Sequence, residues 1–581
     1  TVNNANQTTD VTHTYATAGE YYVSITGTVT TFGRVNYPNA NKLIEVVSFG
    51  DLGIKSLNYA FMSATNLTSV PQVLPASVTN LKATFHGANS FNDPDITLWD
   101  ISNVTDMSSM FLDATSFNQP IGSWNTESVT TIRDLFKGAD AFNQNISAWN
   151  TSNVTDMEGV FRNNDAFNNG GDPNIGNWNT SNVTNMTYMF QGATVFNQPV
   201  GGFEVENVQF MTGLFNNAIA FNNGGVDDIK NWVFSPTLTG MFALFQNAQN
   251  FNQDISSWNV STITNMEFMF NGANAFNQDI STWDVSNVTT MTHLFSGNDM
   301  TFNQNLASWD IGKVTSMSNM FANMSSLSKE NYTSTLIGWG QQTVQNEVTL
   351  DAPNIQYDYV AYHDRQNLKD TYGWTIIDGG LYYNEVNSWE DLHNIRNDLT
   401  AAYKLMQDLG PNDPGYTSYA IVHTDNNFGL GWEPIGWGIT AGFSGLLDGN
   451  GYSVSGFKFY GTSNTSRIAF ISELDEKGWV KNFGVEDFLI SGENSGLGDN
   501  SAGLIGINNG RIDSSYAKGS VIVSQTNHNS SSIGVLVGFN NTNGRIVESF
   551  SAGSVVAKSR VGGLVGKNDG IIKNSYTTAS V

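Results

Sequence analysis

Hydrophobic and polar residues follow a pattern along this chain that returns about every 25 residues. In one copy, Val104, Met107 and Phe111 have the spacing of a single helical face. In another, Trp258 and Val260 alternate with polar residues, as in a short strand with one buried side. The pattern therefore predicts a short strand, a short helix and an extended return in every copy.

The predicted helix is bounded by residues that commonly start and stop helices. Thr105 lies at its beginning, where the side chain could cap free amide groups. Glycine–alanine pairs follow the phenylalanine of the repeat, where a short helix should end. These pairs are residues 138–139, 192–193 and 272–273.

Tryptophan marks the repeat most clearly. The tryptophans follow one another at intervals of 25 to 29 residues, with Phe203 in place of one of them. Two turns further upstream keep the hydrophobic spacing without tryptophan, which gives about eleven turns. Because one turn cannot bury its apolar side alone, we expect a solenoid with columns of like side chains. The tryptophans are Trp99, Trp124, Trp149, Trp178, Trp232, Trp258, Trp283 and Trp309.

An asparagine also recurs once per turn, directly after the second phenylalanine. A stack of identical amides can satisfy backbone groups where the chain bends. We therefore expect a structural ladder of amides here and no chemistry. Its members are Asn92, Asn118, Asn143, Asn168, Asn197, Asn222, Asn252, Asn277 and Asn303.

Two turns carry four extra residues at the same point of the repeat, in residues 169–174 and 223–228. Insertions at one phase should protrude from one edge of a solenoid. A tolerated surface loop is the favoured interpretation, and a site for a cation or ligand is the alternative. The carboxylates that could hold Ca²⁺ are Asp172, Asp227, Asp228 and Asp448, the last in a turn that resembles part of a calcium loop.

The pattern changes near residue 380. Residues 388–399 have the capping serine, early acids and apolar face of one amphipathic helix. Beyond them, short apolar strands alternate with Gly/Asn corners, and Gly506, Gly538 and Gly566 are 32 and 28 residues apart. This spacing predicts a parallel β-helix, in which glycine lets rungs approach at about 4.8 Å. The whole chain is thus expected to form tandem solenoids.

The composition of the chain limits the classes of partner and chemistry that we expect. The chain has 581 residues, a net charge of −27 and no cysteine. Such acidity disfavours nucleic acid as a partner and anionic membranes, while it suits solubility or cation binding. The missing cysteine excludes disulfides and thiolate chemistry. No apolar run reaches the roughly 20 residues of a membrane span, so we expect no membrane insertion within this segment.

Candidate chemistry is sparse. The histidines His13, His86, His293, His363, His393, His423 and His528 are scattered and form no metal-binding motif. No nucleophile elbow or phosphate-binding loop occurs. Paired carboxylates such as Asp475-Glu476 could in principle cleave sugars, but they stand in turn-like contexts. We therefore predict no enzyme, no catalytic residue and no cofactor, with structural Ca²⁺ as an option.

The repeat template W-(D/N)-(V/I/T)-S-N-V-T-x-M-x-x-(M/L)-F-x-x-A-x-x-F-N-Q resembles the 26-residue repeat of BspA-like leucine-rich repeat bacterial surface proteins. This resemblance implies a leucine-rich-repeat-like α/β solenoid over residues 51–327. Residues 1–50 resemble the end of a polycystic-kidney-disease-type β-sandwich and would cap the array. Residues 328–380 resemble the family's closing segment, which would cover its last hydrophobic layer.

Residues 381–581 resemble the GLUG motif region of bacterial surface proteins, which implies a β-helix. Neither end of the chain has the pattern of a natural terminus, because no signal peptide opens it and the last rung is open. We expect the protein to be part of a longer chain or assembly.

These resemblances imply a non-enzymatic, extracellular protein at the bacterial cell surface, exported in some relatives by the type IX system. It would act as an adhesin or structural stalk that binds host, matrix, cell or glycan surfaces through repeated lateral contacts, with a protein or a glycan as its surface ligand. The alternative is a carbohydrate-binding or polysaccharide-cleaving β-helix carried on a repeat spacer. A stalk stiffened by Ca²⁺ is a third possibility.

Overall fold

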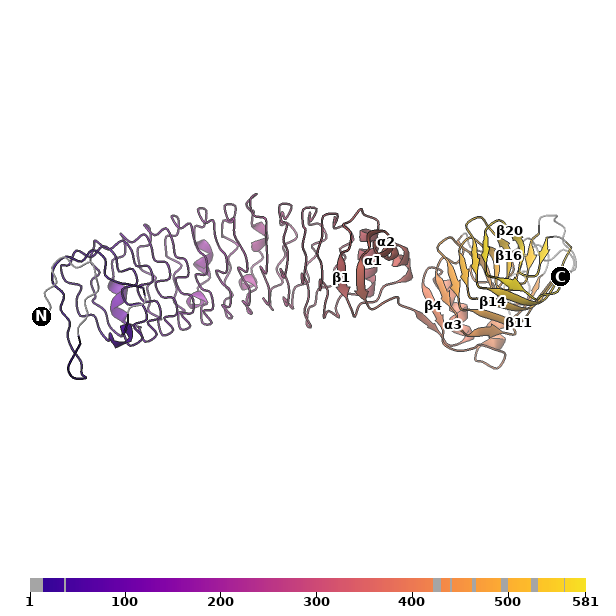
Figure 1. Cartoon of the computed structure of the whole chain (residues 1–581), viewed down its shortest axis with the longest axis horizontal. Helices are drawn as coiled ribbons and strands as arrows, with labels where there is room; N and C mark the ends of the chain where they lie inside the picture. The colour runs from indigo at the N-terminus through magenta and orange to yellow at the C-terminus, as the bar shows by residue number, and fades with distance from the viewer. Residues whose placement is uncertain are drawn as a thin grey trace. The chain divides into compact units, whose positions relative to one another are not determined.

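The computed structural model describes residues 14–35, 38–421, 430–438, 441–461, 467–492, 500–523, 531–558 and 560–581 (Figure 1). The chain divides into two compact units. The first comprises Thr1–Phe210 and Asn217–Val226, and the second comprises Met211–Asn216 and Asp227–Val581. His13, His423 and His528 lie outside the described residues, as does the start of the predicted lead-in.

The first unit is a stack of irregular turns. Successive turns are joined by single parallel β-bridges, for example Asp106 to Thr131 and Thr131 to Asp156. Neither an α-helix nor an extended strand occurs in its described part, including residues 14–35 and 38–50 of the predicted lead-in. Its short 3-10 helices are η1 (Ala40–Lys42), η2 (Pro94–Leu98), η3 (Asn169–Gly171), η4 (Pro173–Asn177) and η5 (Asn223–Gly225).

The predicted strand and helix of each turn are therefore wrong. The amide groups of Met107 and Phe111 donate to Thr131 O and Leu135 O of the next turn, at 3.2 and 3.0 Å. Met110 N instead donates to Met107 O within its own turn, at 3.2 Å. In an α-helix all of these groups would bond four residues back along the chain. The i, i+3 spacing arises here from a series of tight turns.

Left-handed backbone conformations explain why the series does not wind into a helix. Ser109 has φ 56° and Asp113 has φ 54°, and equivalent positions of other turns also have positive φ. Gly138, where we expected a helix end, adopts φ 65° inside the series. Thr105 caps no helix, because its amide and Oγ1 both donate to Thr79 O, at 2.9 and 3.3 Å.

Aromatic columns form the core of the stack, as the sequence predicts. The rings of Phe111 and Phe136 are 5.6 Å apart and tilted by 1°, and those of Trp149 and Trp178 are 6.3 Å apart and tilted by 1°. The indole N–H groups are also tied to the backbone, as Trp178 Nε1 donates to Ile146 O at 3.1 Å. The same bond to a carbonyl of the preceding turn recurs at Trp99, Trp124, Trp149, Trp258, Trp283, Trp309 and Trp339.

The second unit begins with further turns of this kind, including η6 (Ile229–Asn231), and then closes the stack with regular elements. Helix α1 (Lys329–Gly340) is capped by Ser328 Oγ and carries Trp339 into the tryptophan column. A buried ion pair joins Arg365 to Asp378 through two hydrogen bonds of 2.8 and 3.0 Å. The other closing elements are β1 (Thr349–Ala352), η7 (Tyr359–Ala361), α2 (Tyr362–Tyr372) and β2 (Thr375–Asp378).

The predicted helix after residue 388 is confirmed in part. Helix α3 (Trp389–Asn394) starts at the capping Ser388, and the chain then continues as η8 (Ile395–Asn397). Beyond it lies the π-helical turn η9 (Tyr416–Ala420). These segments pack at the start of the strand-rich region.

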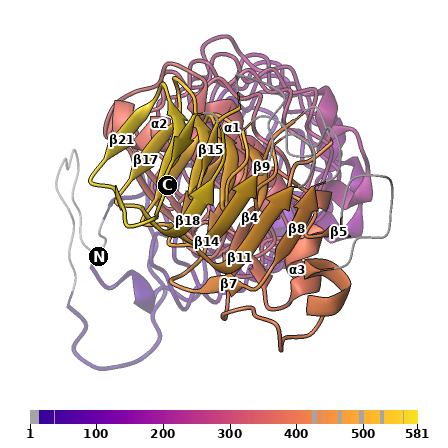
Figure 2. The same ribbon diagram turned by 90° about the vertical axis from the view of Figure 1, so that its right-hand side faces the viewer.

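The strand-rich region is a parallel β-solenoid, as the glycine spacing predicts. Its rungs contribute strands to separate parallel sheets, and Figure 2 shows β8, β11, β14 and β18 as neighbours in one of them. Only β5 pairs antiparallel among its described strands. The first half comprises β3 (Asn384–Val386), β4 (Ala402–Leu405), β5 (Leu430–Gly431), β6 (Leu446–Asp448), β7 (Ser453–Ser455), β8 (Lys458–Gly461), β9 (Ile471–Leu474), β10 (Trp479–Lys481) and β11 (Gly484–Gly492).

The register between rungs repeats the sequence period. Ile505 pairs with Val537, and Val537 pairs with Val565. The remaining strands are β12 (Ile505–Asn508), β13 (Arg511–Asp513), β14 (Tyr516–Val523), β15 (Ile533–Gly534), β16 (Val537–Asn540), β17 (Arg545–Val547), β18 (Phe550–Val556), β19 (Val561–Gly562), β20 (Val565–Asn568), β21 (Ile571–Lys573) and β22 (Tyr576–Thr577).

The recurrent glycines of the β-solenoid are needed for space and not for turning. A Cβ atom on Gly506 would lie 2.4 Å from Ser472 O, and one on Gly538 would lie 2.7 Å from the carbonyl carbon of Asn500. At Gly566 the nearest atom would be Ile533 N, at 2.4 Å. Any larger residue would push adjacent segments apart.

Candidate functional site

The candidate calcium ligands in the first insertion serve the loop itself. Asp172 Oδ1 accepts a hydrogen bond from Asn174 N at 2.8 Å, which starts the 3-10 helix η4. Its other oxygen accepts from Asn145 Nδ2 at 2.5 Å. Both oxygens of this carboxylate are therefore already engaged, one within the loop and one by the preceding turn.

The remaining candidates are also spread among local partners. Asp227 pairs with Lys230 at 2.5 Å, next to Asp228 in the second insertion. Asp448 accepts from Asn450 N at 2.9 Å and pairs with Lys481 at 3.1 Å. Within the described residues, no three histidine or acidic side chains gather in a geometry suited to a metal ion. Ca²⁺ binding stays a prediction.

The recurrent asparagines are placed where they bind the backbone of the next turn. Asn118 Oδ1 accepts from Asn143 N at 3.0 Å, and Asn143 Oδ1 accepts from Asn168 N at 2.8 Å. In the second unit, Asn252 Oδ1 accepts from Asn277 N at 3.0 Å. These side chains hold the bend of each turn, and their acceptor oxygens take a second hydrogen bond within the stack, as Asn143 Oδ1 does from Gly170 N at 2.9 Å.

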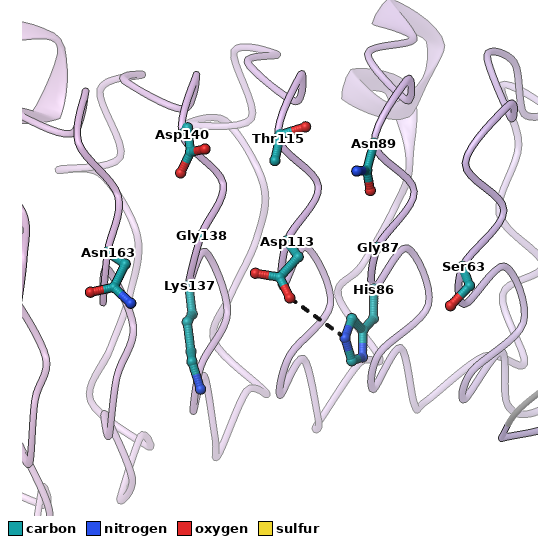
Figure 3. A pocket seen from close by; sticks show the side chains of 10 residues that line it. All are labelled: Ser63, His86, Gly87, Asn89, Asp113, Thr115, Lys137, Gly138, Asp140 and Asn163. Atoms are coloured by element: carbon teal, nitrogen blue, oxygen red, sulfur yellow. Dashed lines mark ion pairs between the residues drawn. The ribbon is translucent and has the colours of Figure 1, made fainter.

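An open groove of about 640 Å³ crosses several turns of the first unit, and we call it the first groove. Side chains from successive turns line it in rows, as Figure 3 shows for Asn89, Thr115 and Asp140. Asp113 faces His86 of the preceding turn, with the nearest nitrogen and oxygen 4.0 Å apart. The groove therefore combines an acid, a base and amide or hydroxyl groups.

Burial and neighbouring charges shift the pKa values of two side chains in the first groove. Burial lowers the pKa of His86, and Asp113 opposes this by favouring the protonated ring. Burial also raises the pKa of Asp140, and the charges of Asp165 and Asp113 raise it further. Perturbed groups in a groove are typical of binding and reactive sites, so this groove is a candidate for polar ligands.

The floor of the first groove depends on an alternation of glycine with larger residues. Asp113, Gly138 and Asn163 occupy one position in three successive turns, all with positive φ. A Cβ atom on Gly138 would lie 2.3 Å from Asp113 Oδ1. Each acidic or amide side chain thus occupies the space that the glycine of the next turn leaves open.

A second open groove, of about 350 Å³, lies in the second unit, and we call it the second groove. Phe268, His293 and Asn319 enter it from three successive turns. Sequence reasoning missed both grooves. One signal was available for the second, because Phe295 and Phe302 are seven residues apart where other turns have six.

Aromatic rings also stack on the β-solenoid. Tyr516 and Phe550 have centroids 5.0 Å apart, and Phe550 and Tyr576 are 5.3 Å apart, with the planes tilted by 13° and 7°. Because the rings cover one another's faces, this column offers ring edges to a ligand.

Within the described residues, no helix has the length and apolar character that crossing a membrane would require.

The turn array matches a known repeat family. Residues 55–172, 146–238 and 223–335 match the model of a family described as "Mycoplasma protein of unknown function, DUF285". Halomucin of Haloquadratum walsbyi is 30% identical to this chain over 193 residues, which are 32% of this chain and 2% of Halomucin. The chain thus spans a very small share of the length of this curated relative. The recurrent template is accordingly similar to a family of repeats, and its description assigns no activity.

Proposed function

We propose that this protein is a non-enzymatic, extracellular surface protein that adheres to other surfaces through repeated weak contacts. The observation that carries the proposal is the return of one residue type at one exposed position, turn after turn. In the first unit, threonine recurs in this way on the outside of the stack, at Thr79, Thr105, Thr130 and Thr155.

Such rows favour multivalent binding. A surface that meets one threonine can meet the next in the same orientation, so weak contacts add along the stack. The hydroxyl groups also donate to carbonyls of the preceding turn, as Thr130 Oγ1 does to Thr105 O at 3.0 Å. These hydrogen bonds fix the orientation of the threonine side chains and so reduce the side-chain entropy that is lost on binding.

The resemblance to BspA-like and GLUG proteins supports a place at the bacterial cell surface, with the type IX system as one export route. The net charge of −27 supports an exposed, soluble position and disfavours nucleic acid. The family match adds no activity to this picture, because its members are described as of unknown function.

The test measures adhesion of the full chain to immobilised matrix proteins, polysaccharides and whole cells. A variant that lacks residues 259–283 loses one turn in phase, since Trp258 and Trp283 are equivalent. We expect retention on at least one surface and a modest rise in dissociation rate for this variant, below about tenfold. Absence of retention on every surface would contradict adhesion.

The same experiment addresses the alternative of a polysaccharide-cleaving protein. New reducing ends, released from a bound polysaccharide and abolished by Asp140→Asn or Glu476→Gln, would favour an enzyme. Binding without new reducing ends favours the adhesin. The carboxylate of Glu476 accepts from Asn543 at 2.7 Å, as a structural group would.

A further inference from the structure

The second groove lies where the turn array departs from its own regularity. Gly297 has φ 157°, and the segment after it holds the one extra residue between Phe295 and Phe302. Asn298 is exposed in this longer segment and lines the groove. The volume of about 350 Å³ falls in the roughly 300–1,000 Å³ range of small-molecule sites.

The lining of the second groove holds no acidic side chain, although the chain carries a net charge of −27. It contains no aspartate, glutamate, lysine or arginine. An ionic ligand that moved from water into this groove would therefore meet no carboxylate, ammonium or guanidinium partner, and its desolvation would cost free energy. The chemistry favours a neutral polar ligand.

Amide groups are available to such a ligand. The side chains of Asn298, Asn319 and Asn323 have no hydrogen-bond partner among the described residues, whereas the ladder asparagines are engaged. Each amide offers two donors and one acceptor oxygen. This mixture matches the hydroxyl groups of a sugar, which both donate and accept.

A stacked aromatic pair forms one side of the groove. The rings of Phe268 and His293 are 4.7 Å apart and tilted by 12°. Ser296 Oγ lies 3.1 Å from His293 Nδ1 and holds the imidazole in place. A rigid aromatic wall beside several amides suits a ligand with one apolar face and a polar rim.

We propose that the second groove binds a neutral saccharide unit of a polysaccharide or glycoconjugate. The sugar hydroxyls bond to the asparagine amides, and the C–H groups of the sugar pack against the ring edges of the aromatic pair. This inference rests on the proposed function, since it names the ligand class that an adhesive surface recognises. The first groove, with Asp113 and Asp140, is lined by charge and does not share this preference.

The test titrates the full chain with neutral oligosaccharides of glucose, galactose, mannose and N-acetylglucosamine, and with acidic oligogalacturonate. The variant Asn319→Gly/Asn323→Gly removes two amides at positions with φ 58° and 61°, where glycine keeps the backbone unstrained. Asn217→Gly is the matched control, because Asn217 has φ 57° at the position equivalent to Asn323 and lines neither groove.

We expect binding of at least one neutral oligosaccharide, weakened tenfold or more in the double variant and unchanged by Asn217→Gly. Asn298→Ala, in the exposed segment outside the aromatic stack, should weaken it in the same direction even if the double variant fails to fold. No neutral binding, a preference for oligogalacturonate, or equal loss in the control overturns the proposal. Adhesion to protein surfaces without any saccharide binding would leave the proposed function standing and remove this inference alone.

Discussion

The turn array of the first unit and the β-solenoid of the second unit both bury columns of like side chains, but they satisfy their backbones differently. In the array, alternate amides such as Met107 N and Met110 N bond to the next turn and to their own turn. In the β-solenoid, β11 and β14 pair over most of their length. Long ladders of backbone hydrogen bonds therefore stabilise the β-solenoid. Isolated backbone hydrogen bonds, together with side-chain amides, stabilise the turn array.

The difference appears again in the use of glycine. Gly138 of the array has φ 65°, so it supplies a left-handed turn. Gly506 of the β-solenoid lies within strand β12 and has no positive φ, and what it supplies is space beside Ser472 O. Glycine thus provides a left-handed turn in the array and space in the β-solenoid. Substitutions at the two kinds of glycine should therefore differ in their effect on stability.

The largest effect is expected from the shared feature, the buried columns. Trp178→Ala should lower the free energy of unfolding by about 3–5 kcal/mol, because it opens a cavity between adjacent layers and leaves Ile146 O without its 3.1 Å bond to the indole. Urea unfolding followed by circular dichroism checks this. Trp178→Phe is the control and should cost much less, since Phe203 occupies the equivalent place in the next turn. Equal costs for the two variants would contradict the column.

A smaller effect should set the two kinds of glycine apart. Gly506→Ala should destabilise the β-solenoid by about 1–3 kcal/mol, because the added Cβ would overlap Ser472 O. Gly451→Ala, with φ 87° and nothing within 4 Å of its Cβ, should cost about 1 kcal/mol for backbone strain alone. Unfolding midpoints measure both, and a larger cost at Gly451 would refute the crowding argument.

The amide ladder of the array should contribute somewhat less. Asn143→Ala leaves the amides of Asn168 and Gly170 without the acceptor that now lies 2.8 and 2.9 Å away. We expect a loss of about 1–2 kcal/mol, together with faster hydrogen exchange at these two amides. Unchanged exchange would show that the ladder is incidental.

The smallest effect concerns pH. Burial holds the pKa of His86 below its ordinary value, so the unfolded chain takes up a proton at a pH where the folded chain does not. The free energy of unfolding should therefore fall as the pH drops from about 6.5 through the folded pKa. His86→Gln should flatten this slope and leave stability at pH 8 nearly unchanged. A steeper slope in the variant would reverse the sign of the argument.

The sequence predicted the stacking and the β-solenoid because both depend on period alone. Gly506, Gly538 and Gly566 repeat at the intervals that the strand register shows. The predicted helix was wrong because Val104, Met107 and Phe111 have a spacing that helices share with three-residue turns. Asp113, Gly138 and Asn163 at one position were a signal for left-handed turns, since these residue types tolerate positive φ.

The grooves could not be predicted in the same way. Their lining depends on which side chains of successive turns lie next to one another, as His86 and Asp113 do. Such neighbours are about 25 residues apart in the sequence, and their distance follows only from the conformation of each turn. The candidate calcium ligands could be picked out from the sequence, but their structural role could not. Asp172 and Asp448 are acidic, and yet each accepts a backbone hydrogen bond within its own local turn.

The central claim is that the turns of the array stack without helices, and amide I infrared spectroscopy of the full chain tests it directly. The account predicts a helical component that matches α1, α2 and α3, which have 12, 11 and 6 residues, beside dominant turn and parallel β components. A helical component several times larger, equivalent to one short helix in every turn, would contradict it.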